Sequence, residues 1–420
     1  MFAKRDAYHV YLLMEGSLAL FVGLIFTVNM VYQATTVGLN PLQLVLVGTT
    51  LELVVFVFEV PTGIVADVYS RRLSILIGVL LVGFGFALEG LFPIFGVVLL
   101  AQVFWGLGAT FTSGASQAWI ADEVGEERAG KALLRASQAG MIGGLIAIPL
   151  SVALASVSIQ LPIVLGGVLT MIMAGVLALI MPENGFRPTP PGERTTWGAL
   201  SDTLRSGLRL VRGRTMLLIF LGVAAISGLY SEGFDRLWTA HLLEDYRFPT
   251  LGDLEPVVWF GVIRAVSIVL SISATEVVRR QVGTSHQGRI AHALIGLTVL
   301  TVVGILAFAL AESFALALIA YWLVSVARTV TEPLVAAWTN LHAESSVRAT
   351  IFSLTNQVNA IGQIAGGPGV GYIGKVRSLR AALVVSGLML SPAVLLFARG
   401  LRESRDVPVV PATAAAPAAD

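Results

Sequence analysis

The chain has 420 residues, of which 56% are hydrophobic and 13% are charged, and its formal net charge is +1. With a mean hydropathy of +0.83, it has too few charged side chains to cover a water-exposed surface, which excludes an ordinary soluble protein and indicates a membrane protein. Cysteine is absent and the five histidines show no ligand spacing, so we expect no disulfide, no metal site, no cofactor and no nucleic-acid surface.

Polar residues, proline and glycine divide the chain into apolar segments of about 20 residues, the length that crosses a bilayer as a helix. The predicted spans are 10–32, 42–65, 73–92, 95–119, 133–157, 162–181, 216–243, 257–278, 290–310, 314–338, 347–373 and 381–397. The sequence therefore predicts an all-α membrane protein with twelve transmembrane helices.

The orientation of these spans follows from their positive charges, because Lys and Arg near span ends stay on the cytoplasmic side. With the N-terminus inside, most of the 27 Lys and Arg residues fall in inner loops, and the outer loops hold Arg247, Lys375, Arg377 and Arg380. Both termini are expected in the cytoplasm. Dominance of Arg over Lys and the absence of glycosylation sequons favour a bacterial plasma (inner) membrane.

The longest inner loop divides the chain into two halves. We expect an N-terminal six-helix bundle over 1–181, a linker over 182–214, a C-terminal bundle over 215–400 and a disordered tail over 401–420. Apolar residues between Trp197 and Val211 recur at helical spacing, which predicts a helix on the inner leaflet or a solvated linker helix.

Shifting the chain by 219 residues superposes parts of the two halves. The shift pairs Ala118-Trp119 with Ala337-Trp338, Gln138 with Gln357, Ile142 with Ile361, Gly143 with Gly362, and Pro149 with Pro368. Spans four and five thereby fall on spans ten and eleven. This indicates a duplicated six-helix unit, an arrangement known in transporters with the substrate path between the halves.

The loop after the second span carries a polar motif, "GIVADVYSRR". Gly63, Asp67, Arg71 and Arg72 resemble the loop signature of the major facilitator superfamily, a Gly-x-x-x-Asp element followed by basic residues. The resemblance implies two pseudo-symmetric bundles and a gate in which Asp67 meets the start of the eleventh helix. The alternative is that both arginines only mark the inner side of the membrane.

Two departures from the family pattern affect the finer assignment. Gln102 stands where proton-coupled members commonly carry an arginine in span four. The glycine-proline signature of antiporters belongs in span five, and its densest match, "GQIAGGPGVG", lies in span eleven instead.

Carboxyl groups inside the predicted spans are candidates for carrying a proton. A charge at mid-bilayer is unfavourable by about 2.5 to 3.5 kcal/mol, so such a group needs a partner, a cavity or a proton. We expect proton coupling at Glu52, Glu59 and Glu15, with Asp235 as a further candidate. A neutral glutamic acid or a helix-to-helix hydrogen bond would explain each of them equally well.

Polar residues on other spans predict the substrate cavity. In the family, spans one, four, seven and ten line it, and the candidates here are Gln102, Ser113, Trp238, Arg264, Arg328 and Asn356. Glu232 and Arg236 are spaced for a structural pair one helical turn apart.

The leading functional hypothesis is a monomeric, proton-coupled secondary transporter that exports small amphipathic, drug-like compounds by alternating access. A proton symporter that imports a nutrient is the first alternative. The second is an intramembrane enzyme, which the absence of His-Glu-x-x-His and Gly-x-Ser-x-Gly motifs makes a poor match.

Overall fold

The computed structural model describes residues 6–188, 190, 215–249, 256–282, 287–343 and 348–406. The predicted linker helix and most of the predicted tail lie outside these residues. The N-terminal helices are α1 (Ala7–Thr35), α2 (Pro41–Ile64) with the π-helical turn η1 (Val65–Tyr69), α3 (Arg71–Leu91), α4 (Phe95–Thr112), α5 (Ala115–Val124), α6 (Glu126–Ala155) and α7 (Gln160–Ile180). The C-terminal helices are α9 (Thr215–Asp245), α10 (Pro256–Val282), α11 (Gln287–Leu310), α12 (Phe314–His342), α13 (Arg348–Val376) and α14 (Leu379–Asp406).

These helices confirm the predicted all-α membrane fold. Eleven helical segments in the described residues are long and apolar enough to cross a membrane, and α13 supplies the twelfth segment of comparable length. Along α13, "TNQVNAIGQIAGGPGVG" interrupts the apolar pattern with glycines and carboxamides, so it lacks a strongly hydrophobic stretch. A helix of this composition is suited to a protein contact rather than to lipid.

The fourth span differs from the single helix predicted over 95–119. It is broken at Ser113 and Gly114, between α4 and α5, where Gly114 adopts φ 68°. This left-handed backbone region suits glycine because it has no Cβ.

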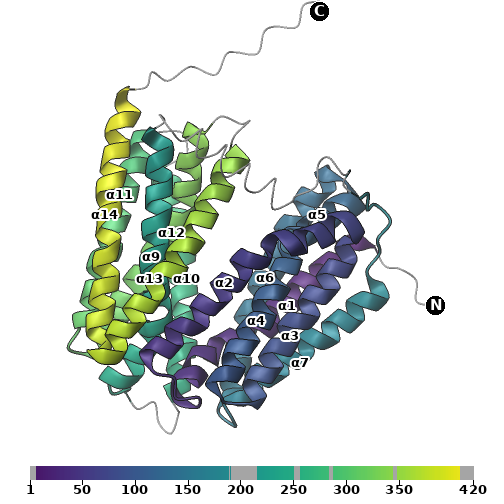
Figure 1. Ribbon diagram of the computed structural model, residues 1–420, viewed down its shortest axis with the longest axis horizontal. Helices are drawn as coiled ribbons and strands as arrows, with labels where there is room; N and C mark the ends of the chain where they lie inside the picture. The colour runs from purple at the N-terminus through teal and green to yellow at the C-terminus, as the bar shows by residue number, and fades with distance from the viewer. Residues whose placement is uncertain are drawn as a thin grey trace, which may run out of the picture.

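The helices form two lobes that converge at one side of the molecule and spread apart at the other (Figure 1). Helices α1 to α7 make the N-terminal lobe and α9 to α14 the C-terminal lobe. We call the spread side, toward which α5 and the C-terminal end of α14 point, the open side. The opposite side, where α2 meets α13, is the closed side.

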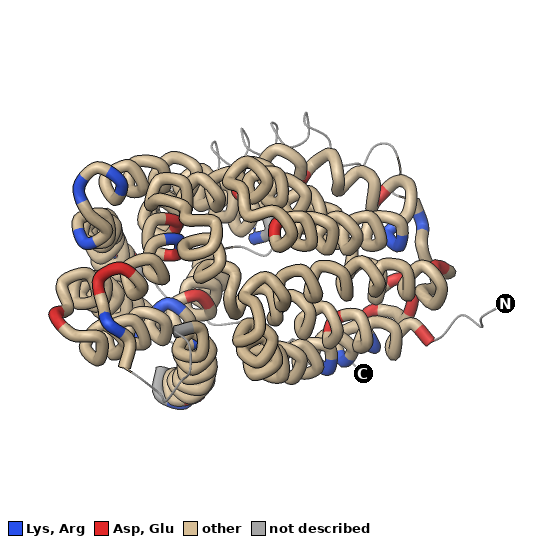
Figure 2. The backbone as a smooth tube through the Cα atoms, turned by 90° about the horizontal axis from the view of Figure 1, so that it is seen from below, with Lys and Arg blue, Asp and Glu red and all other residues tan. Residues whose placement is uncertain are grey.

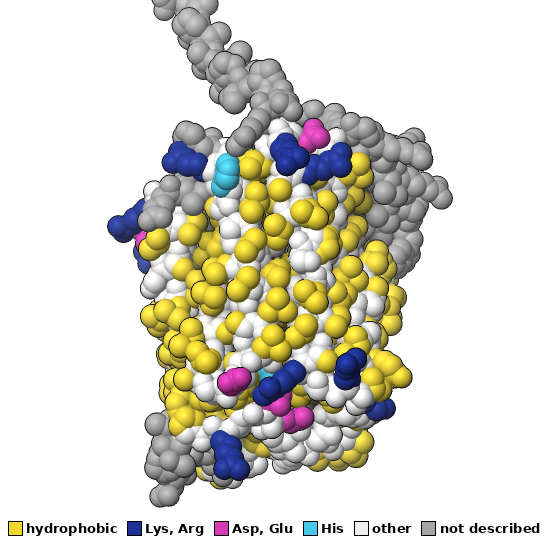
Figure 3. All heavy atoms as spheres, turned by 90° about the vertical axis from the view of Figure 1, so that its left-hand side faces the viewer, with side chains coloured by type: hydrophobic (Ala, Val, Ile, Leu, Met, Phe, Trp, Pro, Cys, Tyr) yellow, Lys and Arg dark blue, Asp and Glu magenta, His cyan; other side chains and the backbone are white. Residues whose placement is uncertain are grey.

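The distribution of side chains matches a bilayer environment. On the face of the C-terminal lobe seen in Figure 3, a broad apolar band separates charged residues near both ends. Charged residues are sparse along the helices in both lobes (Figure 2). An outer surface this apolar is expected to face lipid.

The two lobes repeat the same packing. Gly143 of α6 lies against the backbone of α1 at Gly16, and Gly362 of α13 lies against the backbone of α9 at Gly228. These two glycines are paired by the 219-residue shift, and α1 and α9 are the first helices of their lobes. The structure therefore supports a duplicated unit.

Candidate functional site

A cavity of about 840 Å³ opens within the C-terminal lobe. Its walls come from α9, α11, α12, α13 and α14. The residues that carry its chemistry are Tyr230, Phe234, Asp235, Trp238, Tyr321, Arg328, Glu332, Asn356, Asn359 and Gln363. Its volume falls within the range of about 300–1,000 Å³ typical of small-molecule sites.

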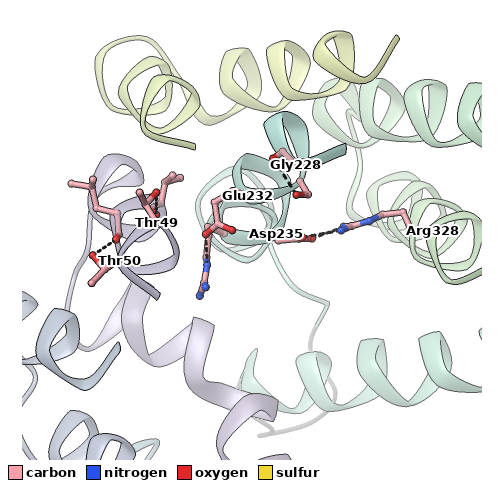
Figure 4. A network of polar contacts seen from close by, with 10 residues as sticks. Thr49, Thr50, Gly228, Glu232, Asp235 and Arg328 are labelled. Atoms are coloured by element: carbon pink, nitrogen blue, oxygen red, sulfur yellow. Dashed lines mark hydrogen bonds and ion pairs between the residues drawn. The ribbon is translucent and has the colours of Figure 1, made fainter. Parts of the chain in front are cut away.

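An ion pair lies at the centre of this cavity. The guanidinium of Arg328 on α12 donates to both carboxylate oxygens of Asp235 on α9, and the Nη2–Oδ2 distance is 2.8 Å (Figure 4). The side chains are 30% and 43% exposed, so the pair remains open to the cavity. The guanidinium also lies 5.6 Å from the ring centroid of Tyr230 and 5.7 Å from that of Phe234. Two hydrogen bonds and two rings thus fix its position.

Aromatic rings form one wall beside the ion pair. Trp238 stacks on Tyr321 with ring centroids 4.4 Å apart, and Phe234 stacks on the same tyrosine at 6.4 Å. The carboxamides of Asn356, Asn359 and Gln363 come from α13, and Gln363 donates to Asn359 at 2.8 Å. The cavity therefore presents flat apolar surface next to hydrogen-bonding groups.

A second polar group lies where the lobes meet. On α9, Nε of Arg236 donates to Oε1 of Glu232 at 2.9 Å, so the predicted pair forms. Glu232 points toward α2, which carries Thr49 and Thr50, whereas Asp235 points toward Arg328 (Figure 4). Gly48 of α2 lies against this pair, and Glu52 lies one helical turn further along the same face of α2.

Glycines allow this contact between the lobes. A Cβ at Gly48 of α2 would collide with the side chains of Glu232 and Arg236. A Cβ at Gly371 of α13 would lie 3.0 Å from the Cβ of Val45, and one at Gly367 would lie 3.1 Å from Oγ1 of Thr49. Helices α2 and α13 therefore approach closely on the closed side.

The loop motif adopts a different set of contacts from the one its resemblance implies. Nη1 of Arg71 lies 2.5 Å from Oδ2 of Asp122, and Nη2 of Arg72 donates to the carbonyl of Ala178 at 2.5 Å, so both arginines bind within the N-terminal lobe. Gly63 has open space around it rather than a neighbouring helix. Asp67 has no hydrogen bond or ion pair among the described residues. Its contact with the eleventh helix remains a prediction for a state in which this side closes.

The predicted proton carriers occupy separate places. Glu52 is half-buried and faces the opposite lobe, and Glu15 is half-buried on α1 beside Tyr11. Glu59 is exposed near the open side and accepts a hydrogen bond from Ser113 at 3.1 Å. Asp235 is engaged with Arg328 in the cavity.

The predicted cavity residues divide into two groups. Trp238, Arg328 and Asn356 line the cavity. Arg264 lies half-buried behind its wall beside Tyr321, and Ser113 lies away from it near the open side. Gln102 is fully buried in the N-terminal lobe, so its assignment to the cavity is not supported by its position.

The partner of Gln102 is a residue that the sequence reasoning missed. Glu89 of α3 is 0% exposed, and its carboxyl group accepts hydrogen bonds from Gln33 at 2.7 Å and from Gln102 at 3.2 Å. The signal was available, because Glu89 is an ionisable residue inside a predicted span. Because Glu89 lies near the end of that span, the sequence alone suggests a residue at the level of the lipid headgroups rather than a buried one.

The model of the Major Facilitator Superfamily matches residues 12–367. The chain belongs to the Major Facilitator Superfamily. This explains the repeated six-helix lobes and the cavity between helices, and the family consists of transporters rather than enzymes.

Individual relatives of this superfamily member are distant. It is 23% identical over 362 residues to a Bacillus subtilis (strain 168) protein described as the uncharacterized MFS-type transporter YxaM, with 85% of this chain and 86% of that protein covered. The similarity spans nearly the whole length of both proteins. It supports a multi-pass membrane transporter.

Solved structures share the fold at lower identity. The nucleoside transporter NupG matches with a TM-score of 0.71 at 13% identity, covering 96% of this chain and 100% of that one. The peptide transporter POT in complex with sulfate matches with a TM-score of 0.73 at 14% identity, covering 95% of each chain. A bacterial homologue of the human lysosomal transporter Spinster, in an inward-facing and unoccupied conformation, matches with a TM-score of 0.70 at 14% identity, covering 94% and 96%.

Proposed function

We propose that this superfamily member is a proton-coupled exporter of small amphipathic compounds that works by alternating access in a bacterial plasma membrane. The observation that carries the proposal is the cavity in the C-terminal lobe, which combines stacked aromatic rings with an exposed ion pair. A drug-like molecule with one flat apolar part and one polar part would find a complementary surface for each.

The charge of the cavity favours a basic substrate. The charges of Asp235 and Arg328 offset each other, whereas Glu332, one turn further along α12, is exposed and has no ion pair among the described residues. A substrate cation near Glu332 would restore charge balance, and its aromatic part would lie along Trp238 and Tyr321.

The open side is proposed to face the cytoplasm, with both termini there and the protein acting as a monomer. Arg71, Arg72, Arg128, Lys131 and Arg135 lie on that side in the N-terminal lobe, as the positive-inside rule requires. Substrate would enter the cavity from the cytoplasm, and release would require the contact between α2 and α13 to open.

Glu52 is the first candidate for coupling a proton to this movement. It faces Glu232 and Arg236 across the lobe contact, so separation of the lobes on the closed side would change both its charged neighbours and its access to water. Glu15, Glu59 and Asp235 are the remaining candidates.

Everted membrane vesicles from cells that produce the protein test the proposal. Ethidium is the probe. A pH gradient with the acidic side inside the vesicle should drive ethidium into the vesicle, and collapse of the gradient should release it. Glu52→Gln should abolish this accumulation but retain ethidium binding, with Glu312→Gln in the exposed α11–α12 loop as the matched control. Equal ethidium accumulation with and without the pH gradient would rule out proton coupling.

A nutrient importer is the second candidate. The three carboxamides on α13 beside the stacked rings also suit a nucleobase or another flat metabolite with several hydrogen-bonding groups. Under this alternative, right-side-out vesicles with the acidic side of the pH gradient outside would accumulate radiolabelled uridine. Uridine uptake with no ethidium export would replace the first proposal by the second.

A further inference from the structure

The N-terminal lobe contains a buried polar cluster that lies apart from the cavity. It consists of Glu89 on α3, Asn29 and Gln33 on α1, and Gln102 on α4, and each of these side chains is at most 3% exposed. Gln33 Nε2 donates to Oε1 of Glu89 and Gln102 Nε2 donates to Oε2, so both carboxyl oxygens are held in place. Asn29 also faces the carboxyl group.

The carboxyl group has no counter-ion of its own. Among the described residues, no Lys, Arg or His nitrogen is paired with Glu89 in a salt bridge. The cation that faces it is Arg236 of the opposite lobe, and that guanidinium already binds Glu232 at 2.9 Å. Burial without a counter-ion disfavours the ionised form of a carboxyl group, even where amide N–H groups bind its oxygens.

The amides around the carboxyl group lack a donor. Oδ1 of Asn29, Oε1 of Gln33 and Oε1 of Gln102 are all buried and accept no hydrogen bond from any described residue. Buried acceptors of this kind are uncommon, because each one loses its bond to water without replacing it. One proton on Glu89 would remove the buried charge, and once a neighbouring amide turns its oxygen toward the carboxyl group, the proton would also supply a donor to this set.

Among the described residues, no other carboxyl group and no histidine is hydrogen-bonded to Glu89. The hydroxyl of Tyr32 on α1 donates to the backbone carbonyl of Glu89 at 2.6 Å. Helix α7 packs nearby through Ile163 and Val164, which are apolar and lie against Gly90. The titratable and charged groups on the neighbouring elements are therefore Tyr32, which binds the backbone carbonyl of Glu89, and Arg236 of the opposite lobe.

We propose that Glu89, held by Gln33 and Gln102 and facing Asn29, is a binding site for a single proton in the N-terminal lobe. Its use in transport rests on the proposed proton coupling, whereas the site itself does not. The donors on both carboxyl oxygens favour a proton over a sodium ion, because sodium would require oxygen atoms where the amides now present N–H groups.

The site connects to lobe movement through Arg236. Nε of this arginine lies against Gly48 of α2 on the closed side, so separation of the lobes there would move its charge away from the N-terminal lobe, which holds Glu89. Proton occupancy at Glu89 would then depend on which side of the protein is open.

Infrared spectroscopy of the purified protein in lipid vesicles tests the site without a substrate. At neutral pH the unmodified protein should show a carbonyl band of a protonated carboxylic acid that is lost in Glu89→Gln, which keeps the shape and a donor. Glu312→Gln, in the exposed α11–α12 loop of the other lobe, is the matched control and should leave the band unchanged. Identical spectra for the unmodified protein and Glu89→Gln would overturn the proposal.

A second variant keeps the test decisive if Glu89→Gln fails to fold. Gln102→Leu removes one hydrogen-bond partner, so the same band should shift in frequency rather than vanish, and an unshifted band would contradict the site. Loss of the band on adding sodium chloride, with potassium chloride as the control, would assign the site to sodium and overturn the proton. Loss of the band in Glu89→Gln without any gradient-driven ethidium flux in the unmodified protein would refute the proposed function and leave the site standing.

Discussion

The side chains of Asp235 and Arg328 show how one ion pair can serve a binding site without being buried. Both are partly exposed, so water screens their attraction and the pair contributes roughly 1 kcal/mol or less to stability. Its geometry is nevertheless fixed by two hydrogen bonds and by the rings of Tyr230 and Phe234. The pair is therefore better suited to orienting a ligand than to holding the fold.

Replacing Arg328 by lysine tests this role. Arg328→Lys keeps the charge but loses the bidentate geometry, so ethidium affinity should change about tenfold, which corresponds to about 1.4 kcal/mol, while thermal stability stays close to that of the parent. Fluorescence titration measures the affinity. Arg279→Lys, in an exposed pair with Glu276, is the control and should bind normally. An unchanged affinity for Arg328→Lys would exclude the pair from the binding site.

Individual residues differ in how far the sequence could place them. The Glu232–Arg236 pair and the cavity face of α9 follow from helical spacing, because residues three and four apart share a face. The cluster at Glu89 joins residues 56 and 13 positions apart in the sequence, through Gln33 and Gln102. No local pattern encodes such pairings, so the sequence could not connect Gln102 with Glu89.

At the scale of single helices, the glycines of α13 form the close contacts with α2 and α9. Gly362 and Gly366 lie against α9, and Gly367 and Gly371 lie against α2. Small residues let two backbones approach without interlocking side chains, so such a contact can separate and re-form. The dense glycine motif of span eleven is explained by this contact.

A bulky residue at Gly371 should prevent the contact from closing. In Gly371→Val the new side chain would meet Val45 and Leu42, so the closed side should open more often, by at least about tenfold if the lost contact is worth about 1.4 kcal/mol. Because the chain has no cysteine, Thr49→Cys on the same contact face of α2 gives a single reporter and keeps Val45 and Leu42 in place. Its labelling by a membrane-impermeant maleimide should be slow in the parent and fast in Gly371→Val.

Gly369 provides the matched control on the same helix. A Cβ at this position would meet nothing within 4 Å, so Gly369→Val should leave the labelling rate unchanged. Equal acceleration by both substitutions would show that valine disturbs α13 in general and would contradict a specific glycine contact.

The start of α3 is stabilised by a carboxylate from beyond the end of α7. Glu183 accepts hydrogen bonds from Oγ of Ser70 at 2.7 Å and from the backbone N–H of Arg72 at 2.9 Å. An anion at a helix N-terminus is favourable, so Glu183→Gln should lower the free energy of unfolding by about 1 kcal/mol. Thermal unfolding in detergent measures it, with Glu312→Gln as the control, and equal melting temperatures for the two variants would count against this capping role.

The helices themselves were predictable except where the backbone departs from a regular α-helix. Hydropathy locates the spans because apolar segments of bilayer length are unmistakable in composition. The break at Ser113 and Gly114 and the π-helical turn η1 after Pro61 leave hydropathy unchanged, so they could not be read from it. The turn η1 lies within the polar loop motif. The break in span four precedes α5, which carries Asp122, the partner of Arg71.

At the scale of the whole molecule, the proposed alternating access would take place about the contacts on the closed side. The lobes share a repeated packing, and they meet through contacts of α2 with α13 and of α6 with α10. On the open side the arginines of the loop motif pair within one lobe, which leaves Asp67 available for a contact across the gap. Alternating access requires the first set of contacts to break as the second forms.

A disulfide across the closed side should stop this movement. A Cβ at Gly261 of α10 would lie 3.9 Å from the Cβ of Val152 on α6, within the range of about 3.5–4.5 Å for a disulfide. The double variant Val152→Cys/Gly261→Cys should therefore cross-link when oxidised. The cross-linked protein should stay open on the open side, and it should lose nearly all gradient-driven ethidium transport. Dithiothreitol should restore transport, because reduction frees the two lobes. Each single-cysteine variant should be insensitive to oxidation, since the chain has no other cysteine. Full transport by the cross-linked protein would mean that substrate crosses without separation of α6 from α10, which a rocking mechanism does not permit.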